Sequence, residues 1–152
     1  VNKPNVHGLI VGEERKKSKF LNELKNTTAK LGLNKNITFV GHRADVKEVI
    51  SISSIVFSLA KEPEAFGRIS LESLSMGIPV IAYSHGGVKE QMLEILPEGL
   101  ISVGNINLVC SLANKWLKKG PRANKNLSFT LKSMLSNTVK VYEQALIEKW
   151  QK

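Results

Sequence analysis

The residues of this chain whose types and spacing suit chemistry lie between Glu64 and Glu72, two carboxylates separated by seven residues. Phe66, Gly67 and Arg68 follow a loop and are expected to open a helix. Glycine lets a ligand approach the backbone closely, and the unpaired N–H groups of a helix's first turn, beside an arginine, suit a phosphate. Carboxylates on either side can accept hydrogen bonds from hydroxyl groups. The segment therefore predicts a site for a sugar joined to a nucleotide.

The elements that must position this segment alternate between strand and helix. Short apolar runs bounded by glycine or polar residues predict strands, and apolar positions at helical spacing predict helices. The expected strands are 6–11, 37–40, 55–59, 80–83 and 100–103, and the expected helices are 16–31, 45–51, 66–76, 88–96, one that opens at 105 or 107, and 127–150. This alternation predicts an α/β fold with a Rossmann-like parallel sheet that has helices on both faces.

The loops that follow the expected strands are predicted to lie at the same edge of the sheet. In open α/β sheets, ligands bind at the carboxyl ends of the strands. The segments 41–43, 61–67 and 84–87 each follow an expected strand. We therefore expect these three segments to converge on one edge.

The composition is that of an ordinary globular domain. The chain has 152 residues, of which 42% are hydrophobic, so we expect one domain with a core of its own. No apolar run approaches the roughly 20 residues of a membrane helix. No signal-peptide pattern opens the chain and Cys110 is its one cysteine, which favours a reducing, cytoplasmic location. Cys110 shares helical spacing with Val109 and Trp116, so we predict a core residue and not a nucleophile.

The net charge of +9, from 22 basic and 13 acidic residues, indicates an anionic partner. Nucleic acid, an anionic membrane surface and an anionic substrate all fit such a charge. The basic residues concentrate in 15–19 and 115–125 without interleaved aromatics, so no nucleic-acid partner is expected. Two interpretations of these basic clusters remain: a solvated surface, or peripheral contact with acidic lipid headgroups.

Three motifs in order carry a resemblance to a known family: the pair Glu64 and Glu72, the run Met76-Gly-Ile-Pro-Val, and His85-Gly-Gly. Together they resemble the retaining glycosyltransferases of the GT-B fold, and more narrowly the members of group 1 (family 4). The resemblance extends from about residue 6 to residue 142.

The resemblance implies that residues 1–152 form a single nucleotide-sugar-binding domain, the carboxyl-terminal donor-binding half of a two-domain enzyme, with 127–150 as its closing helix. In the family this half begins with a strand that carries Gly-Arg and, shortly after, a Lys, and an acceptor domain precedes it. The printed chain contains neither, so we expect a piece of a larger enzyme that binds a donor but transfers no sugar alone. The absent strand should either leave a gap between its neighbours or let them pair directly.

The resemblance also implies roles for the predicted site. Glu64 matches the acid near the donor sugar's hydroxyls and takes the catalytic assignment, and Glu72 matches the acid that holds the ribose hydroxyls. Gly86 and Gly87 match a glycine pair behind the sugar pocket, although a plain strand-to-helix turn would also use them. The backbone amides expected to meet the donor's phosphates belong to Phe66, Gly67, Arg68 and Ile69.

A second group of residues matches the family's loop beside the nucleotide base. This loop follows the expected strand 37–40 and contains Gly41, Arg43 and Asp45. The resemblance implies contacts to the base near Arg43 and Asp45. Asp45 fits the amino-terminal cap of the next helix equally well.

The implied reaction is retaining transfer of a sugar from a nucleoside diphosphate to an acceptor hydroxyl. It would proceed by orienting the donor and stabilising the departing diphosphate, with no covalent nucleophile and no cofactor. No His, Cys or Asp cluster has metal-ligand spacing, so no metal is expected. Basic charge without an export signal suggests work on a cell-envelope glycolipid or polysaccharide.

Two other hypotheses stay open at this point. One is a GT-B nucleotide-sugar epimerase, in which the glutamate pair would not be expected. The other is a basic module that binds nucleic acid or membrane, which would respond to salt but not to nucleoside diphosphates.

Overall fold

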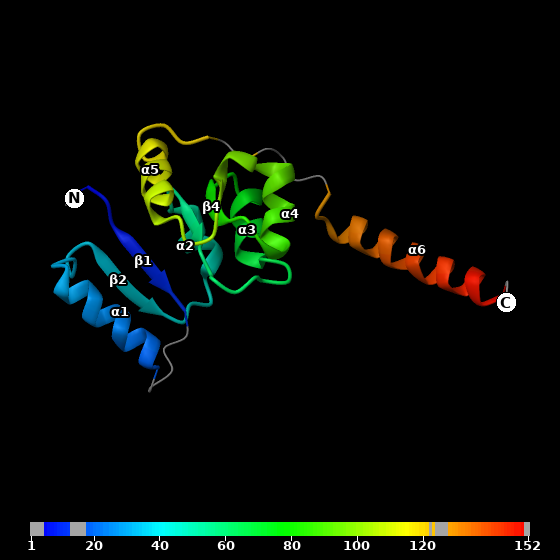
Figure 1. Ribbon diagram of the computed structural model, residues 1–152, viewed down its shortest axis with the longest axis horizontal. Coiled ribbons are helices and arrows are strands. Elements are labelled where there is room, and N and C mark those ends of the chain that lie inside the picture. Colours follow the sequence, from blue (N-terminus) through cyan, green and yellow to red (C-terminus); the bar gives the residue numbers. More distant parts are fainter. Residues whose placement is uncertain (1–4, 13–17, 122, 124–127, 151–152) are drawn as a thin grey trace. The chain divides into compact units, whose positions relative to one another are not determined.

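The computed structural model describes residues 5–12, 18–121, 123 and 128–150 of the chain. The chain divides into two compact units, one up to Val46 and one from Lys47 onward. Each unit contains a parallel sheet of its own (Figure 1).

The first unit is a strand–helix–strand motif. Strands β1 (Gly8–Val11) and β2 (Ile37–Gly41) pair in parallel, and α1 (Lys19–Lys30) connects them. The side chain of Ser18 caps α1 by accepting a hydrogen bond, 3.2 Å long, from the N–H group of the third helical residue. The expected strand–helix–strand order of this region is confirmed.

The second unit has a three-stranded parallel sheet in the order β3-β4-β5. A turn of 3-10 helix, η1 (Pro97–Gly99), precedes the last strand. The other elements are α2 (Val46–Ser51), which begins at the boundary between the units, β3 (Val56–Ser58), α3 (Arg68–Ser75), β4 (Val80–Tyr83), α4 (Gly86–Ile95), β5 (Leu100–Ile101), α5 (Ile106–Trp116) and α6 (Leu131–Trp150).

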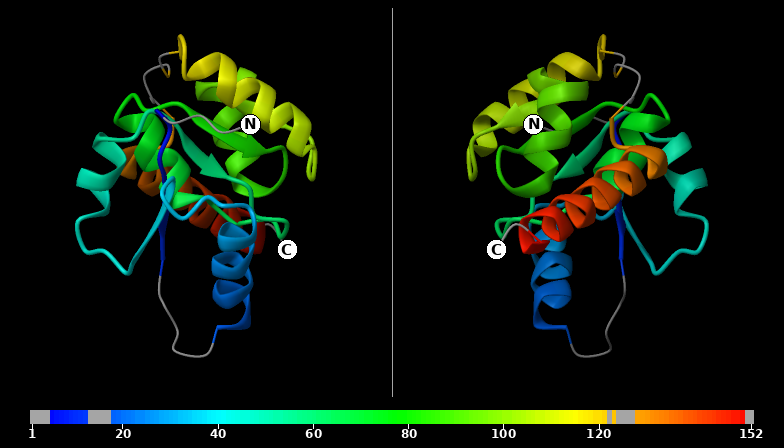
Figure 2. Two further views of the ribbon diagram at one scale, coloured as in Figure 1. Left: turned by 90° about the vertical axis from the view of Figure 1, so that its left-hand side faces the viewer. Right: turned by 90° about the vertical axis from the view of Figure 1, so that its right-hand side faces the viewer.

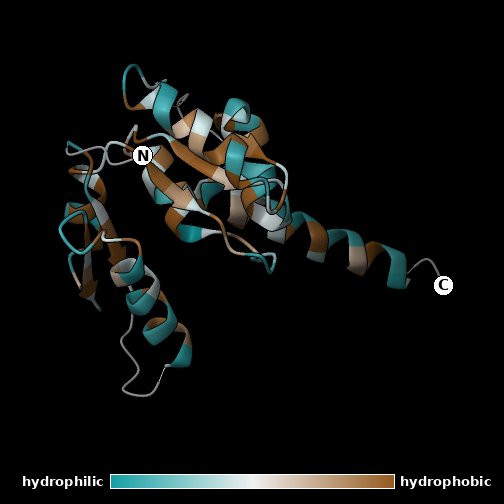
Figure 3. Cartoon of the chain, turned by 60° about the vertical axis from the view of Figure 1, so that its left-hand side comes forward, coloured by the Kyte–Doolittle hydropathy of each residue, from teal (hydrophilic) through white to brown (hydrophobic). Residues whose placement is uncertain are grey.

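Strand β4 forms the centre of this second unit. All four of its residues are buried, and apolar residues line the strands in Figure 3. Figure 1 shows α5 on one side of β4 and α3 and α4 on the other, and Figure 2 gives two views along that direction. The α/β fold class, with parallel strands and helices on both faces, is therefore confirmed.

The strands of the two units form two separate sheets. Within the described residues, β1 pairs with β2, β3 pairs with β4, and β1 and β3 do not pair. Direct pairing of β1 with β3, one of the two expected alternatives, is therefore not seen among the described residues.

The prediction that Cys110 is a core residue is wrong, because its side chain is exposed. The buried residues of α5 are Val109 and Trp116, which lie two helical turns apart on one face. Cys110 is rotated by about 100° from Val109 around the helix axis, which takes it off that face. The apolar stripe of α5 is narrower than its sequence indicates, and Ile106 is also 57% exposed.

Helix α6 corresponds to the expected closing helix. Its apolar side chains are exposed, among them Leu131, Leu135, Val139, Tyr142 and Leu146, which recur at helical spacing and form one stripe. We predict that this stripe covers apolar surface of another domain in the whole enzyme. The side chain of Trp150 lies outside the described part. Within the described residues, no helix is both long and apolar enough to cross a membrane.

Candidate functional site

The predicted phosphate-binding segment lies at the start of α3. The helix begins at Arg68, two residues later than expected, because Gly67 takes a left-handed conformation with φ 80° and ψ 59°. No side chain caps this end, and the first turn contains no acidic residue. Helix geometry leaves the N–H groups of a first turn without partners inside the helix. This end of α3 therefore keeps its partial positive charge, and its first residue, Arg68, is a cation.

Only glycine fits at position 67. A Cβ atom built there would lie 2.3 Å from the Cγ2 atom of Val88 on α4, and the positive φ would strain any other residue. Because Val88 is buried in the core, it cannot easily move aside. The glycine thus lets the loop before α3 rest directly on α4.

The glycine turn at the start of α4 supports the loop that carries Glu64. The N–H group of Gly87 donates a 2.9 Å hydrogen bond to the carbonyl oxygen of Glu64. A Cβ atom on Gly87 would lie 2.3 Å from the carbonyl oxygen of Ala65, and one on Gly86 would lie 2.5 Å from that of Glu64. The pair therefore does more than turn the chain, because it holds the neighbouring loop at backbone distance.

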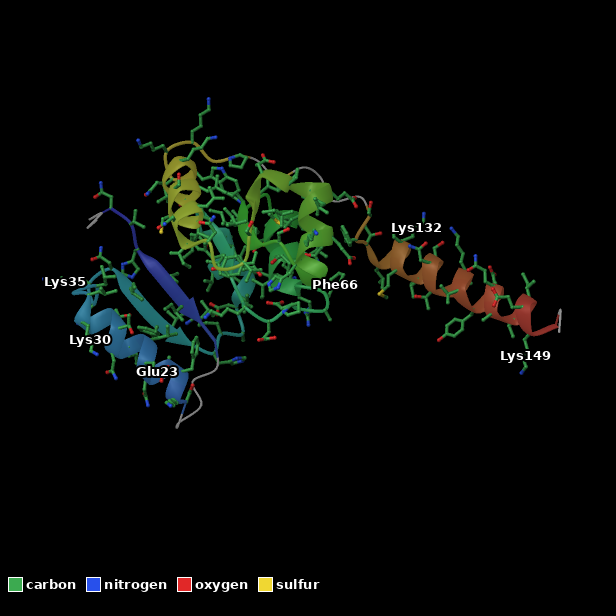
Figure 4. The ribbon with its side chains drawn as sticks, in the orientation of Figure 1. Glu23, Lys30, Lys35, Phe66, Lys132 and Lys149 are labelled. Carbon is green, nitrogen blue, oxygen red and sulfur yellow. The ribbon has the colours of Figure 1, made fainter. Side chains whose placement is uncertain are left out.

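A third contact joins the same loop to α4. The buried side chain of Gln91 donates a hydrogen bond from its Nε2 atom to the carbonyl oxygen of Phe66. The ring of Phe66 is half exposed and meets Phe129 edge-on, with 6.4 Å between ring centroids; Figure 4 labels Phe66. The two expected segments 61–67 and 84–87 are thus brought together. The sequence analysis did not predict Gln91 as a site residue. The one feature that could have indicated it is that a polar residue stands among the apolar positions of the expected helix.

Glu64 itself lines a shallow hollow at the carboxyl ends of β3 and β4. The hollow is lined by Ser58, Ala60, Glu62, Glu64, Tyr83, His85 and Val88. The Nε2 atom of His85 lies 3.0 Å from the carbonyl oxygen of Ala60, so this nitrogen carries the proton. The other ring nitrogen of a neutral His85 is then an acceptor. Ser58 and Tyr83 end their strands, and that position could have marked them as site residues.

Glu72 lies one helical turn beyond Arg68 on α3. Its Oε1 atom is 3.4 Å from a terminal nitrogen of the Arg68 guanidinium. The side chain of Glu72 is 32% exposed and that of Arg68 is 82% exposed, so solvent reaches both groups. An exposed ion pair at this spacing contributes only about 0.3–0.5 kcal/mol. Both charges therefore remain accessible to a ligand. The neighbouring Ile69 is half exposed and is accessible as well.

The residues expected near the base lie in the first unit. Gly41 ends β2 with a positive φ of 69°. Arg43 and Asp45 form a two-pronged ion pair, in which Arg43 Nε lies 2.7 Å from Asp45 Oδ1 and a second guanidinium nitrogen meets Oδ2. This hydrogen bonding lowers the pKa of Asp45 and raises the pKa of Arg43. The carboxylate expected as a helix cap or base contact thus has an arginine partner, and its role at the base stays a prediction.

Residues 1–142 of the chain, which include all the residues of the candidate site, match the family model of "Glycosyl transferases group 1". The chain belongs to this family. N-acetyl-alpha-D-glucosaminyl L-malate synthase of Bacillus anthracis is a curated relative, 29% identical over 110 residues, which cover 72% of this chain and 28% of the relative.

Two solved structures have a fold similar to that of this chain. The glycosyltransferase of Rickettsia africae ESF-5 is 24% identical with a TM-score of 0.78, over 93% of this chain and 40% of that one. Anabaena Alr3699/HepE in complex with UDP and glucose is 26% identical with a TM-score of 0.71, over 77% of this chain and 32% of that one. The fold is thus that of the GT-B glycosyltransferases, and this chain spans less than half the length of each of these proteins.

Proposed function

We propose that this chain is the donor-binding, carboxyl-terminal part of a retaining hexosyltransferase that takes its sugar from a nucleoside diphosphate. One observation carries the proposal: the uncapped start of α3, with Arg68 beside it, lies next to a loop that α4 holds at backbone distance. This arrangement presents N–H groups and a cation to a diphosphate. It also places Glu64 in the lining of a hollow within the same unit.

The reaction follows from the charges that develop in it. A sugar leaving a diphosphate places negative charge on the leaving oxygens, and fixed N–H groups and a guanidinium stabilise such charge. The backbone of 66–69 and the Arg68 side chain take this role in our proposal. Glu64 orients the sugar hydroxyls and Glu72 the ribose hydroxyls, so that catalysis rests on positioning. The proposal needs no cofactor and no metal.

The relatives support a uridine nucleotide as the first candidate donor. The Anabaena protein was solved with UDP, with UDP and glucose, and with UDP-glucose. In the proposed enzyme, Gly41, Arg43 and Asp45 lie beside the base. Residues outside this chain supply the acceptor side, and the whole protein works at the cytoplasmic face of a membrane on a cell-envelope glycan or glycolipid.

A titration of the purified chain tests the proposal. UDP, GDP and ADP are each added at fixed ionic strength, and binding is followed through the backbone amide resonances of residues 64–72. We expect one of the three nucleotides to bind and to shift the resonances at the start of α3, while UDP-glucose turnover by the chain alone stays undetectable. Binding to DNA or RNA that weakens with salt, without any response to the nucleotides, would refute the proposal.

A further inference from the structure

Gln91 is a polar residue in an apolar place. It lies on α4, its exposed fraction is 0%, and its neighbours Val88, Met92 and Ile95 belong to the hydrophobic core. Its Nε2 atom donates to the carbonyl oxygen of Phe66, while its Oε1 atom has no hydrogen-bond partner among the described residues. Exchanging the two amide atoms would set an oxygen against the carbonyl oxygen, so the orientation follows from the contact.

A side chain that only filled this space would be apolar. A buried amide oxygen without a partner destabilises the folded state, whereas methionine or leucine fills a similar volume without that loss. The amide therefore acts through its one hydrogen bond, which ends on the peptide group between Phe66 and Gly67.

The direction of that peptide group decides where the Gly67 N–H group points. The peptide is trans, so its carbonyl and N–H bonds point to opposite sides of the chain. Because Gln91 holds the carbonyl toward α4, the Gly67 N–H points away from α4. Glycine itself does not fix this direction, since it populates φ of either sign and so tolerates a flipped peptide. The side chain of Gln91 supplies the constraint that the backbone lacks.

We propose that Gln91 is a positioning residue for the donor diphosphate: it fixes the Phe66–Gly67 peptide so that the Gly67 N–H joins the N–H groups at the start of α3. The inference rests on the proposed function, because it assigns a task to the same site. It adds a buried residue of α4 that touches no substrate and acts through the backbone.

The test compares Gln91→Met with a matched core variant of the same helix, Ile95→Val. UDP and uridine are titrated against the wild-type chain and both variants, with the Gly67 amide resonance as reporter. In Gln91→Met we expect the Kd for UDP to rise about two- to tenfold, the equivalent of one neutral hydrogen bond, and the Kd for uridine to stay unchanged. In Ile95→Val both constants should stay unchanged. Thermal unfolding of each variant is measured alongside.

The possible results separate this inference from the proposed function. If wild type binds UDP and Gln91→Met binds it equally well, Gln91 has no positioning role and the proposed function stands. If both variants lose UDP affinity equally, packing alone accounts for the effect and the inference fails. If wild type binds none of UDP, GDP and ADP, both proposals fall. If it binds GDP or ADP instead of UDP, that nucleotide and its nucleoside replace UDP and uridine in the test. Should Gln91→Met not fold, the wild-type chain still decides: a Gly67 resonance that does not move at saturating UDP overturns the inference.

Discussion

Replacing Glu72 by glutamine tests the ribose assignment most directly. The change keeps the shape of the side chain and removes its charge. A hydrogen bond to a charged group contributes about 1.5–3 kcal/mol, and the side chain is 32% exposed, so solvent competes for it. With the remaining amide oxygen still able to accept, we expect a loss of about 1–2 kcal/mol, which is a five- to thirtyfold larger Kd for UDP. Loss of the exposed pair with Arg68 should cost the fold only about 0.3–0.5 kcal/mol.

Calorimetric titration of UDP and of pyrophosphate distinguishes this role from its alternatives. Glu72→Gln should weaken UDP binding but not pyrophosphate binding, because pyrophosphate has no ribose and the Arg68 guanidinium stays charged after its pair with Glu72 is lost. The control is Glu94→Gln, which removes an exposed charge from α4 and should change neither constant. Equal affinity of wild type and Glu72→Gln for UDP would refute the ribose assignment. An equal loss for both ligands would place the effect on the phosphate side.

Three further predictions follow from particular contacts. Glu64→Gln should leave the Kd for UDP within about twofold but weaken binding of UDP-glucose, by the loss of about one hydrogen bond to the sugar; unchanged UDP-glucose binding in a titration would contradict this role. Gly87→Ala should lower the free energy of unfolding, measured in urea, by about 1–3 kcal/mol, because the new Cβ atom overlaps a backbone carbonyl that cannot move aside. The control is Gly12→Ala, which should leave the free energy of unfolding nearly unchanged, because a Cβ atom there meets nothing within 4 Å. The guanidinium of Arg43 holds the pKa of Asp45 below its usual value of about 4. The ion pair therefore stabilises the fold above that pH, and its contribution is lost as the pH falls through the lowered pKa. In Arg43→Gln, the Asp45 carboxyl followed by NMR should titrate at about pH 4 again, and an unmoved midpoint would exclude the ion pair.

The fold class could be predicted from the sequence because the spacing of apolar residues clearly distinguishes the expected strands from the expected helices. Strand β4 is a continuous apolar run, and all four of its residues are buried. Helix starts were less predictable, since they depend on conformation and not on polarity. The helix expected from residue 66 begins at Arg68 because Gly67 is left-handed, and α4 begins two residues earlier than expected, at Gly86.

The sequence predicted the exposed charged residues and glycines of the candidate site, but not the buried contacts that hold its loop in place. Acids, an arginine and glycines between expected elements are visible in a sequence, because each residue type has a distinct chemistry. Gln91 and His85 act through single backbone carbonyls 25 residues away, and no local pattern contains such a pairing. The prediction that Cys110 is buried was wrong although the local pattern was read correctly. Cys110 does lie on a helix at the expected spacing, but the buried face of α5 is too narrow to include it.

The contacts on α4 explain how the site can combine exposed acids with a fixed backbone. Gly87, Val88 and Gln91 lie within the first two turns of α4 and hold successive parts of one loop, through Glu64, Gly67 and Phe66 respectively. None of these contacts uses a carboxylate side chain, so the acids contribute little to the fold and can stay exposed for a ligand. The glycines and Gln91, by contrast, act on the backbone and cannot change without moving it. Stability and ligand binding should therefore separate by residue: substitutions at the glycines mainly lower the free energy of unfolding, and substitutions at the acids mainly lower affinity.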